Sequence, residues 1–279
     1  MINIDYSFNG NVEYKTYNEI VSKIKEFKNW EHLGTDESGE YGLYGVIIVG
    51  DPSNPAIFIN GAVHGHEYHV IEPIIHVLKL IEDGEHPDQT LNNEILENYC
   101  IIAIPMCNPW GMMQQTDDAE LGIYGYRYTS VGGDINRNFY KMELKEQRIM
   151  RDFFNRFKPF SSADFHMFNP AWQGVSPDKF IAVGNTNDVT NDYITEWVNV
   201  LENATGIPCE VYGSQGNASP TSGSIRGFFA SRRNPHTPHT LGFMLEHERR
   251  GLLGGEVVEN ISSSDLWNAI SINVTLALI

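Results

Sequence analysis

The chain has 279 residues, a length that suits one large α/β domain or two smaller domains. Its 36 acidic and 19 basic residues give a formal net charge of −17, which disfavours nucleic acid and anionic membrane surfaces as partners. A hydrophobic content of 41% is too high for a disordered chain and supports a packed core. The N-terminal sequence has no basic stretch followed by an apolar one, and no apolar run nears the ~20 residues of a transmembrane helix, so we expect a cytoplasmic protein.

Apolar patterns along the chain predict alternating strands and helices. Two β-branched runs, 43–49 and 56–59, flank a turn-rich segment and are predicted to pair with each other. Apolar residues at helical spacing then predict a helix over 67–83, which Gly84 ends. Further strands are expected at 100–104, 180–183 and 241–245, and further helices at 143–157, 193–201 and 265–278. This alternation predicts a three-layer α/β/α sandwich, and since no linker is evident we expect a single domain over residues 1–279.

The first candidate functional residues lie where the strand 56–59 gives way to the helix 67–83. The intervening turn contains glycine and histidine and follows a strand end, where open sheets place their ligands. Glu67 shares a helical face with apolar residues, so its carboxylate is expected on the buried side, where it needs a partner. His64 and Glu67 form a candidate metal pair, because imidazole and carboxylate are ordinary zinc ligands. A carboxylate that caps the helix is the equal alternative.

The other histidines near this turn are weaker candidates. The motif HExxH of many zinc enzymes is absent, because Val70 stands four residues after His66. The predicted helix also carries a polar stripe, typical of a solvated face, formed by His69, Glu72, His76 and Lys79.

Three later segments carry further candidates. His166 ends an expected strand and is either a packed side chain or a third metal ligand. Asp134 and Arg137 share a polar loop with Arg127 upstream, and the planar donors of arginine suit recognition of a carboxylate. Glu246 follows the strand 241–245, where an α/β enzyme carries a catalytic base, and a surface salt bridge is the alternative.

Taken in order, these segments resemble the zinc carboxypeptidase family typified by carboxypeptidase A. The segment from His64 to Glu67 matches its HxxE motif, and the segment from Asp134 to Arg137 matches its D-x-N-R motif. The turn Asn108-Pro109-Trp110-Gly111 resembles the N-P-x-G turn of the family. The ordered set spans residues 17–246 and implies the α/β/α fold of that family, with a mixed, largely parallel central sheet.

The resemblance implies a role for each matched residue at the metal. His64, Glu67 and His166 would hold one zinc ion, Zn²⁺, and leave the fourth position to water. Asp134 would orient His64 by accepting the proton of its other ring nitrogen. Glu246 would take a proton from the attacking water, as the catalytic glutamate of the family.

The same resemblance places three residues around the substrate. Arg127 would stabilise the developing oxyanion, and Asn136 with Arg137 would hold the terminal carboxylate of the substrate. Two features of the family lack a clear match: His66 stands where digestive members carry an arginine, and Tyr212 does not align with their loop tyrosine. The implied reaction is hydrolysis of an amide bond.

Short similarities point to two branches of the family. Residues 220–224, Pro-Thr-Ser-Gly-Ser, resemble a stretch of the bacterial murein tripeptide amidases, cytoplasmic enzymes that release diaminopimelate from a γ-D-glutamyl bond. The segment from Arg127 to Arg137 is also similar to the succinylglutamate desuccinylase and aspartoacylase branch, which cleaves N-acyl amino acids. From residue 181 onward there is no lysine, and all five arginines lie within the stretch that brackets Glu246, which favours a substrate with extra carboxylates. Arg226, where the family builds its side-chain pocket, is the arginine we select for substrate binding.

These observations support three hypotheses. The leading one is a zinc-dependent carboxypeptidase or amidase that acts on a small acidic peptide, such as a murein peptide. The second is an N-acyl amino acid deacylase with the same zinc site. The third is a non-catalytic zinc or peptide-binding module, which is disfavoured because such a module has no need of the base Glu246.

Overall fold

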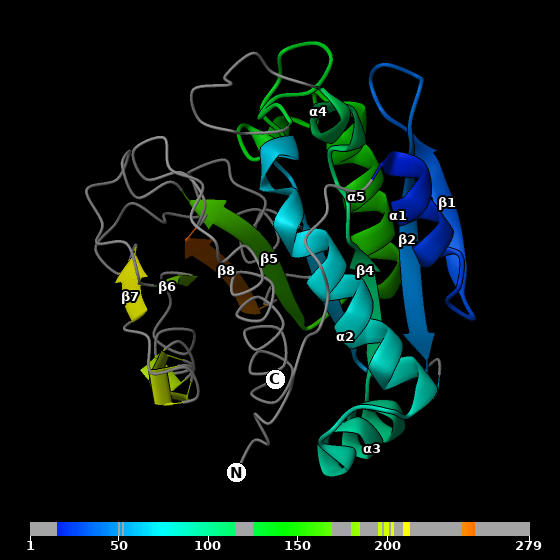
Figure 1. Cartoon of the computed structure of the whole chain (residues 1–279), viewed down its shortest axis with the longest axis vertical. Helices are drawn as coiled ribbons and strands as arrows, with labels where there is room; N and C mark the ends of the chain where they lie inside the picture. The colour runs from blue at the N-terminus through cyan, green and yellow to red at the C-terminus, as the bar shows by residue number, and fades with distance from the viewer. Residues whose placement is uncertain are drawn as a thin grey trace.

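The described residues build one eight-stranded sheet (Figure 1). The computed structural model describes residues 16–49, 51, 53–114, 125–168, 180–184, 195–196, 198–200, 202–203, 209–212 and 241–248. The strands are β1 (Trp30–Thr35), β2 (Gly42–Val49), β3 (Ala56–Gly61), β4 (Cys100–Ile104), β5 (Ser161–Phe168), β6 (Phe180–Gly184), β7 (Cys209–Tyr212) and β8 (Leu241–Glu248). Across the sheet they follow the order β1-β2-β4-β3-β5-β8-β6-β7.

The strand directions make the sheet mixed and largely parallel, as predicted. β3 runs parallel to both β4 and β5, β8 runs parallel to β5, and β7 runs parallel to β6. The antiparallel pairs are β1 with β2, β2 with β4, and β6 with β8. The central strands β4, β3, β5 and β8 therefore point the same way, and their carboxyl ends meet at one edge of the sheet, where such folds bind ligands.

Helices cover both faces of the sheet and complete three layers. The helices are α1 (Tyr17–Ile24), η1 (Gly65–Val70), α2 (Ile71–Asp83), α3 (Gln89–Asn98), α4 (Pro109–Met113), η3 (Phe139–Lys141) and α5 (Lys145–Phe157). On one face, Ile57 and Ile59 of β3 share a hydrophobic cluster with α1 and α2. On the other face, Phe58 packs edge-on against Phe154 of α5, with ring centroids 5.4 Å apart. Because successive residues of β3 reach opposite faces and both faces are covered, the three-layer α/β/α sandwich is confirmed.

The predicted pairing of the strands at 43–49 and 56–59 is wrong. β4 lies between β2 and β3 and pairs with both: Ala103 is the register partner of Val46 on one side and of Ile59 on the other. β2 and β3 therefore lie two strand spacings apart, about 10 Å, a distance that six residues span easily. A short turn-rich connection suggests a hairpin, but β4 contributes an apolar run whose residues are all buried, and this run fills the place between the two strands.

The helix predicted over 67–83 begins later than expected. Residues Gly65–Val70 form the short 3-10 helix η1, and α2 starts at Ile71. The end is as predicted, because Gly84 has a φ of 73° and closes α2 in the left-handed conformation that glycine adopts without strain. The helix predicted at 265–278 lies outside the described residues, and the one at 193–201 is described only in part.

A single domain over residues 1–279 stays a prediction, although the one sheet draws its strands from residues 30–248. Among the described helices, none has both the length and the apolar character needed to span a membrane.

Candidate metal centre

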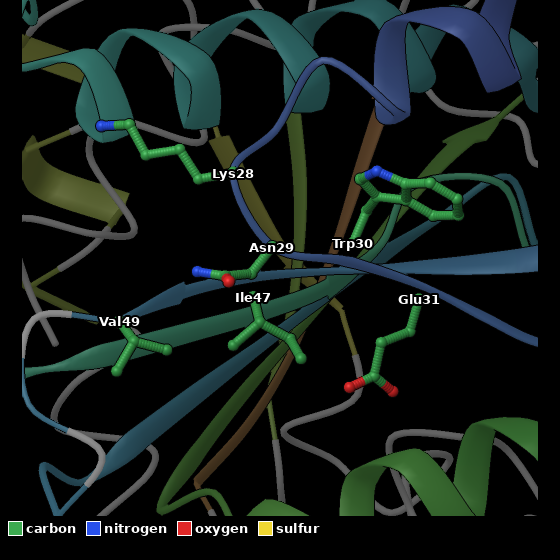
Figure 2. Close-up of a pocket in the computed structure, with 6 residues that line it drawn as sticks. All are labelled: Lys28, Asn29, Trp30, Glu31, Ile47 and Val49. Atoms are coloured by element: carbon green, nitrogen blue, oxygen red, sulfur yellow. The ribbon is translucent and has the colours of Figure 1, made fainter.

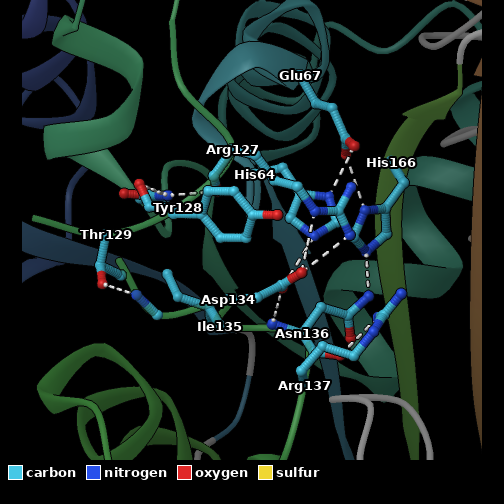
Figure 3. A network of polar contacts seen from close by, with 12 residues as sticks. His64, Glu67, Arg127, Tyr128, Thr129, Asp134, Ile135, Asn136, Arg137 and His166 are labelled. Atoms are coloured by element: carbon cyan, nitrogen blue, oxygen red, sulfur yellow. Dashed lines mark hydrogen bonds and ion pairs between the residues drawn. The ribbon is translucent and has the colours of Figure 1, made fainter. Parts of the chain in front are cut away.

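Three buried polar side chains converge at the carboxyl edge of the central strands (Figure 3). His64 follows β3, Glu67 lies in η1, and His166 lies in β5. Their exposed fractions are 3%, 3% and 1%, and one donor atom from each lies within 4.8 Å of those of the other two. In the part of the chain that the structure describes, this is the one group of three or more histidine, cysteine or acidic side chains with such geometry.

The backbone of the β3–α2 connection explains how Glu67 reaches the two histidines. Gly65 packs so closely against α4 that a Cβ atom there would lie 2.2 Å from backbone atoms of Gly111 and Met112. Glu67 has a φ of −96° and a ψ of 34°, which interrupts the helical geometry of η1. The tight approach to α4 thus requires glycine at position 65, and Glu67 lies in an irregular turn rather than in the first turn of a regular helix.

Glu67 bridges the two histidines with its two carboxylate oxygens. Its Oε1 lies 2.7 Å from Nδ1 of His64, and its Oε2 lies 2.8 Å from Nδ1 of His166. Oε2 also accepts a hydrogen bond from the backbone N–H of Met167 at 3.2 Å. Nδ1 is therefore the inward-facing nitrogen of both rings, and Nε2 of each ring is left for a second partner.

Charge interactions set the protonation of these three groups. Burial alone would lower the pKa of His64, but the carboxylates of Glu67 and Asp134 outweigh burial, and the pKa is raised. Burial would also lower the pKa of His166, but Asp164 and Glu67 hold that pKa well above its usual value. Burial would raise the pKa of Glu67, yet the two adjacent imidazoles hold it well below its usual value. A metal ion that binds here must therefore displace protons from the two histidines.

Each histidine meets a further carboxylate through Nε2. Nε2 of His64 lies 3.2 Å from Oδ1 of Asp134, and Nε2 of His166 lies 2.9 Å from Oδ2 of Asp164. Carboxylates in this position fix the tautomer and the orientation of metal-binding histidines. The structure brings Asp134 to the ring that the resemblance assigns to it.

Arg127 lies on the other side of Asp134 and is held by the turn at Asn108. Nε and Nη2 of Arg127 each lie 3.0 Å from Oδ2 of Asp134, and 27% of the arginine side chain is exposed. Nδ2 of Asn108 donates to the carbonyl groups of Arg127 and Tyr128 at 3.1 and 3.2 Å. Oδ1 of Asn108 accepts from the N–H of Gly111 at 2.9 Å and caps α4. The Asn-Pro-Trp-Gly turn thus positions the segment that carries Arg127.

The following loop carries the two residues predicted to bind the substrate carboxylate. Asn136 is buried, and its Nδ2 lies 3.4 Å from Nε2 of His166. Arg137 is exposed and donates from Nη1 to the carbonyl of Asn136 at 2.9 Å. Gln147 of α5 anchors the loop by donating to the carbonyl groups of Ile135 and Arg137, at 3.0 Å each. The loop therefore presents a surface guanidinium beside the buried centre (Figure 3).

Two predicted residues, and Tyr212, for which no role is predicted, are placed only in part or not at all. Glu246 lies on β8, where its backbone is the register partner of His166 on the adjacent strand β5. Its side chain lies outside the described part of the chain, so its role as a base stays a prediction. Tyr212 ends β7 at the far edge of the sheet, and Arg226 lies outside the described residues.

Two histidines of the β3–α2 connection take different places. The ring of His66 is stacked on that of His64 with centroids 5.9 Å apart, and its Nε2 lies 3.7 Å from Oε1 of Glu67. His69 packs against Tyr68, with ring centroids 4.2 Å apart. His66 therefore borders the centre, whereas His69 does not belong to the group of three converging side chains.

Two contributors to the site were missed by reasoning from the sequence. Asp164 stands two residues before His166 in a strand, and this spacing places both side chains on one face, so the signal was available. Gln147 gave no signal, because it is one of several polar residues in the first turns of α5.

A cavity of about 450 Å³ lies apart from this centre, at the β1 edge of the sheet (Figure 2). Its lining residues are Lys28, Asn29, Trp30, Glu31, Ile47 and Val49. Two of them already have partners: Nζ of Lys28 donates to the carbonyl of Glu82 at 3.0 Å, and Glu31 pairs with Arg156 at 2.7 Å. The convergence of titratable groups, rather than this cavity, marks the candidate site.

The donor set of the centre fits zinc. Two imidazole nitrogens and one carboxylate are a usual set of protein ligands at catalytic zinc sites, where the fourth position stays open, whereas structural zinc sites use four protein ligands. The two outer carboxylates supply the support that such ligands need. Together with an arginine close by, these features are typical of the class of zinc-dependent enzymes.

Comparison with known proteins narrows this class to one family. The family model of Peptidase_M14, described as zinc carboxypeptidase, matches residues 22–187, more than half of the chain. The chain belongs to the zinc carboxypeptidase family, whose members use one zinc ion. A search of curated proteins returned no match.

Solved structures share the fold of this chain. A metallo-carboxypeptidase from Burkholderia cenocepacia has a TM-score of 0.69 and 13% identity, over 94% of this chain and 68% of that one. The metallo-carboxypeptidase from Pseudomonas aeruginosa in complex with (2-guanidinoethylmercapto)succinic acid has a TM-score of 0.68 and 14% identity, with the same coverage. Bovine thrombin-activatable fibrinolysis inhibitor, in complex with tick carboxypeptidase inhibitor, has a TM-score of 0.67 and 16% identity, over 95% of this chain and 97% of that one. At these identities the likeness concerns the fold.

Proposed function

We propose that this protein is a zinc-dependent carboxypeptidase or amidase that hydrolyses the amide bond next to a free carboxylate in a small acidic peptide, such as a murein peptide. The observation that carries the proposal is the buried group of His64, Glu67 and His166 beside a loop that bears guanidinium groups. Such a site holds a metal and an anionic substrate group within reach of each other.

Some residues at the centre bind the metal, and others control the positions of protons. His64, Glu67 and His166 would hold the zinc ion, which when bound would supply Lewis acidity and lower the pKa of water toward neutrality. Asp134 keeps the proton of His64 on Nε2, so that Nδ1 is left to bind. Glu246, whose backbone lies beside His166, accepts a proton from the attacking water and later returns it to the leaving amine.

The guanidinium groups act on the substrate. Arg127 lies against Asp134 and is partly exposed, which suits stabilisation of the oxyanion as the carbonyl carbon is attacked. Asn136 and Arg137 bind the terminal carboxylate, for which the exposed fork of Arg137 offers paired donors. Arg226 is proposed as a further contact to an acidic substrate side chain.

Product analysis by mass spectrometry tests the proposal. Zinc-loaded protein is incubated with a γ-D-glutamyl-diaminopimelate tripeptide, peptides with acidic C-terminal residues, and N-acyl amino acids. Release of a C-terminal residue is the expected result. Release of an acyl acid alone would assign the protein to the deacylase branch, and zinc binding without any product would favour a binding module.

Two variants separate the base from a general effect of charge. Glu246→Gln removes the proposed base and is expected to abolish turnover while zinc stays bound. Glu143→Gln makes the same change at an exposed glutamate on the surface and is expected to leave turnover unchanged. Full activity of Glu246→Gln would refute the assigned mechanism.

A further inference from the structure

Asp164 is held between partners on two adjacent strands, and the roles proposed above do not use it. Its Oδ2 lies 2.9 Å from Nε2 of His166, two residues further along β5. Its Oδ1 accepts a hydrogen bond from Nδ2 of Asn60 on β3. Asn60 and Asp164 are register partners in the parallel pair β3–β5, so the backbone itself brings them together. The exposed fractions of Asn60, Asp164 and His166 are 0%, 2% and 1%, so water competes little for these contacts.

The chemistry of the contacts locates the proton on His166. An ionised carboxylate only accepts hydrogen bonds, so Nε2 of His166 donates to Asp164. Asn60 must present Nδ2 to Asp164, because its Oδ1 would set two acceptors against each other. Nδ1 lies 2.8 Å from Oε2 of Glu67, and a metal ion that binds there displaces the Nδ1 proton. Because Asp164 keeps the other proton on Nε2, the lone pair of the ring is then on Nδ1, facing the metal. Nδ2 of Asn136 lies 3.4 Å from the same Nε2, but an amide NH2 and a protonated ring nitrogen are both donors, so this contact is not a hydrogen bond in that tautomer.

We infer that Asp164, oriented by Asn60, is a positioning residue that holds His166 in the tautomer and the ring orientation required to bind zinc. The inference rests on the zinc site of the proposed function and adds two residues to it. Its physical basis is the double anchoring of one buried carboxylate, by the ring that it orients and by an amide on the neighbouring strand.

Asp164 and Asp134 support their histidines in different ways. Asp134 divides its charge between His64 and Arg127, and 11% of its side chain is exposed. Asp164 has a side chain that is 3% exposed, and within the described part of the chain no lysine or arginine forms an ion pair with it. The negative charge of Asp164 is therefore directed at His166, and its removal leaves the Nε2 proton of that ring without its closest acceptor.

Zinc affinity, measured by competition with a chelator, tests this role without reference to turnover. Asp164→Ala is expected to raise the Kd for zinc about 10- to 100-fold, the usual effect of losing such a partner. Asp164→Asn keeps a carbonyl oxygen that accepts from His166, and the amide of Asn60 can rotate to match the new amide. This conservative variant is expected to recover most of the affinity, to within about tenfold of the wild type.

Ser161→Ala is the matched control. Ser161 is buried on the same strand, and among the described residues its hydroxyl has no hydrogen-bond partner, so the variant removes a buried polar group without breaking a described contact. It is expected to bind zinc as the wild type does. A folded Asp164→Ala protein with wild-type affinity for zinc overturns the inference.

Imidazole N–H signals in NMR spectra of the zinc-loaded protein provide a readout that a merely structural role would not move. The Nε2 protons of His64 and His166, each held by a carboxylate, are expected to exchange slowly with water. Asn60→Ala leaves every direct contact of His166 in place but removes one anchor of Asp164, and it is expected to speed exchange at His166 and not at His64. If Asp164→Ala does not fold, unchanged exchange and unchanged zinc affinity in Asn60→Ala overturn the inference.

These measurements keep the inference distinct from the proposed function. Normal zinc affinity together with normal hydrolysis in Asp164→Ala refutes the positioning role alone. A wild-type protein that binds no zinc refutes both the positioning role and the zinc-dependent function.

Discussion

Replacing Asn108 with alanine removes three hydrogen bonds: one that caps α4 and two that connect α4 to the segment carrying Arg127. The loss of the cap on Gly111 costs about 1 kcal/mol. The carbonyl groups of Arg127 and Tyr128 each lose a donor in a partly buried place, at about 1 kcal/mol each. The total, about 3 kcal/mol, corresponds to a fall in Tm of roughly 6 to 12 °C for a chain of this size. Thermal unfolding followed by circular dichroism measures this change, and hydrolysis should fall as well because Arg127 is displaced.

Asn108→Asp separates the cap from the two contacts with the Arg127 segment. Its carboxylate still accepts from the N–H of Gly111, but it offers the two carbonyl groups an acceptor in place of a donor. The variant is therefore expected to be destabilised at least as much as Asn108→Ala. If Asn108→Asp unfolds at the wild-type temperature, the two donated hydrogen bonds do not hold this segment, and the reasoning is refuted.

Three further predictions concern pH, packing and metal removal. Burial, together with the nearby acids Asp36 and Glu37, raises the pKa of Glu146. The folded state therefore binds this proton more tightly than the unfolded chain does. Stability falls as the pH rises from the pKa of Glu146 in the unfolded chain toward its raised pKa in the folded protein. Glu146→Gln should therefore raise the Tm more at pH 7 than at pH 4, and an equal effect at both would contradict this. Gly65→Ala places a Cβ atom against the backbone of α4 and should abolish zinc binding, whereas Gly39→Ala, with open space around it, should cost only about 1 kcal/mol. Zinc at 100 times its Kd should stabilise the protein by about 2.7 kcal/mol over the metal-free form. The Kd for zinc should rise as pH falls, since protons compete for the two histidines. Calorimetry with and without chelator, repeated at several pH values, measures the stabilisation and the Kd.

Periodicity in the sequence predicted those elements whose apolar residues decide their own packing. The run that forms β4 is buried at every residue, and α2 buries the apolar stripe that its spacing predicts. The order of the strands is harder to predict. The short connection 50–55 suggests that β2 and β3 pair with each other, whereas the neighbour of both strands comes from residues 100–104. Local turn chemistry does not reveal that a distant strand fits between two others.

The candidate site likewise contains residues that the sequence identifies and a contact that it does not. His64, Glu67 and His166 were selected from short motifs and the order in which they occur, and the structure brings them together. The pairing of Asn60 with Asp164 depends on the register of β3 against β5, which joins residues 104 positions apart in the chain. A sequence read along one dimension carries no signal for such a contact.

β3 is synthesised before both of the strands that flank it in the sheet. β3 is buried at every residue and lies between β4 and β5, both of which follow it in the chain. During synthesis it therefore leaves the ribosome as an apolar strand with two unpaired edges, and one of these edges stays unpaired until residues 161–168 have been made. A nascent chain that has not yet produced β5 is thus the form most prone to aggregate, and the addition of β5 covers that edge in the same step that brings His166 to Glu67.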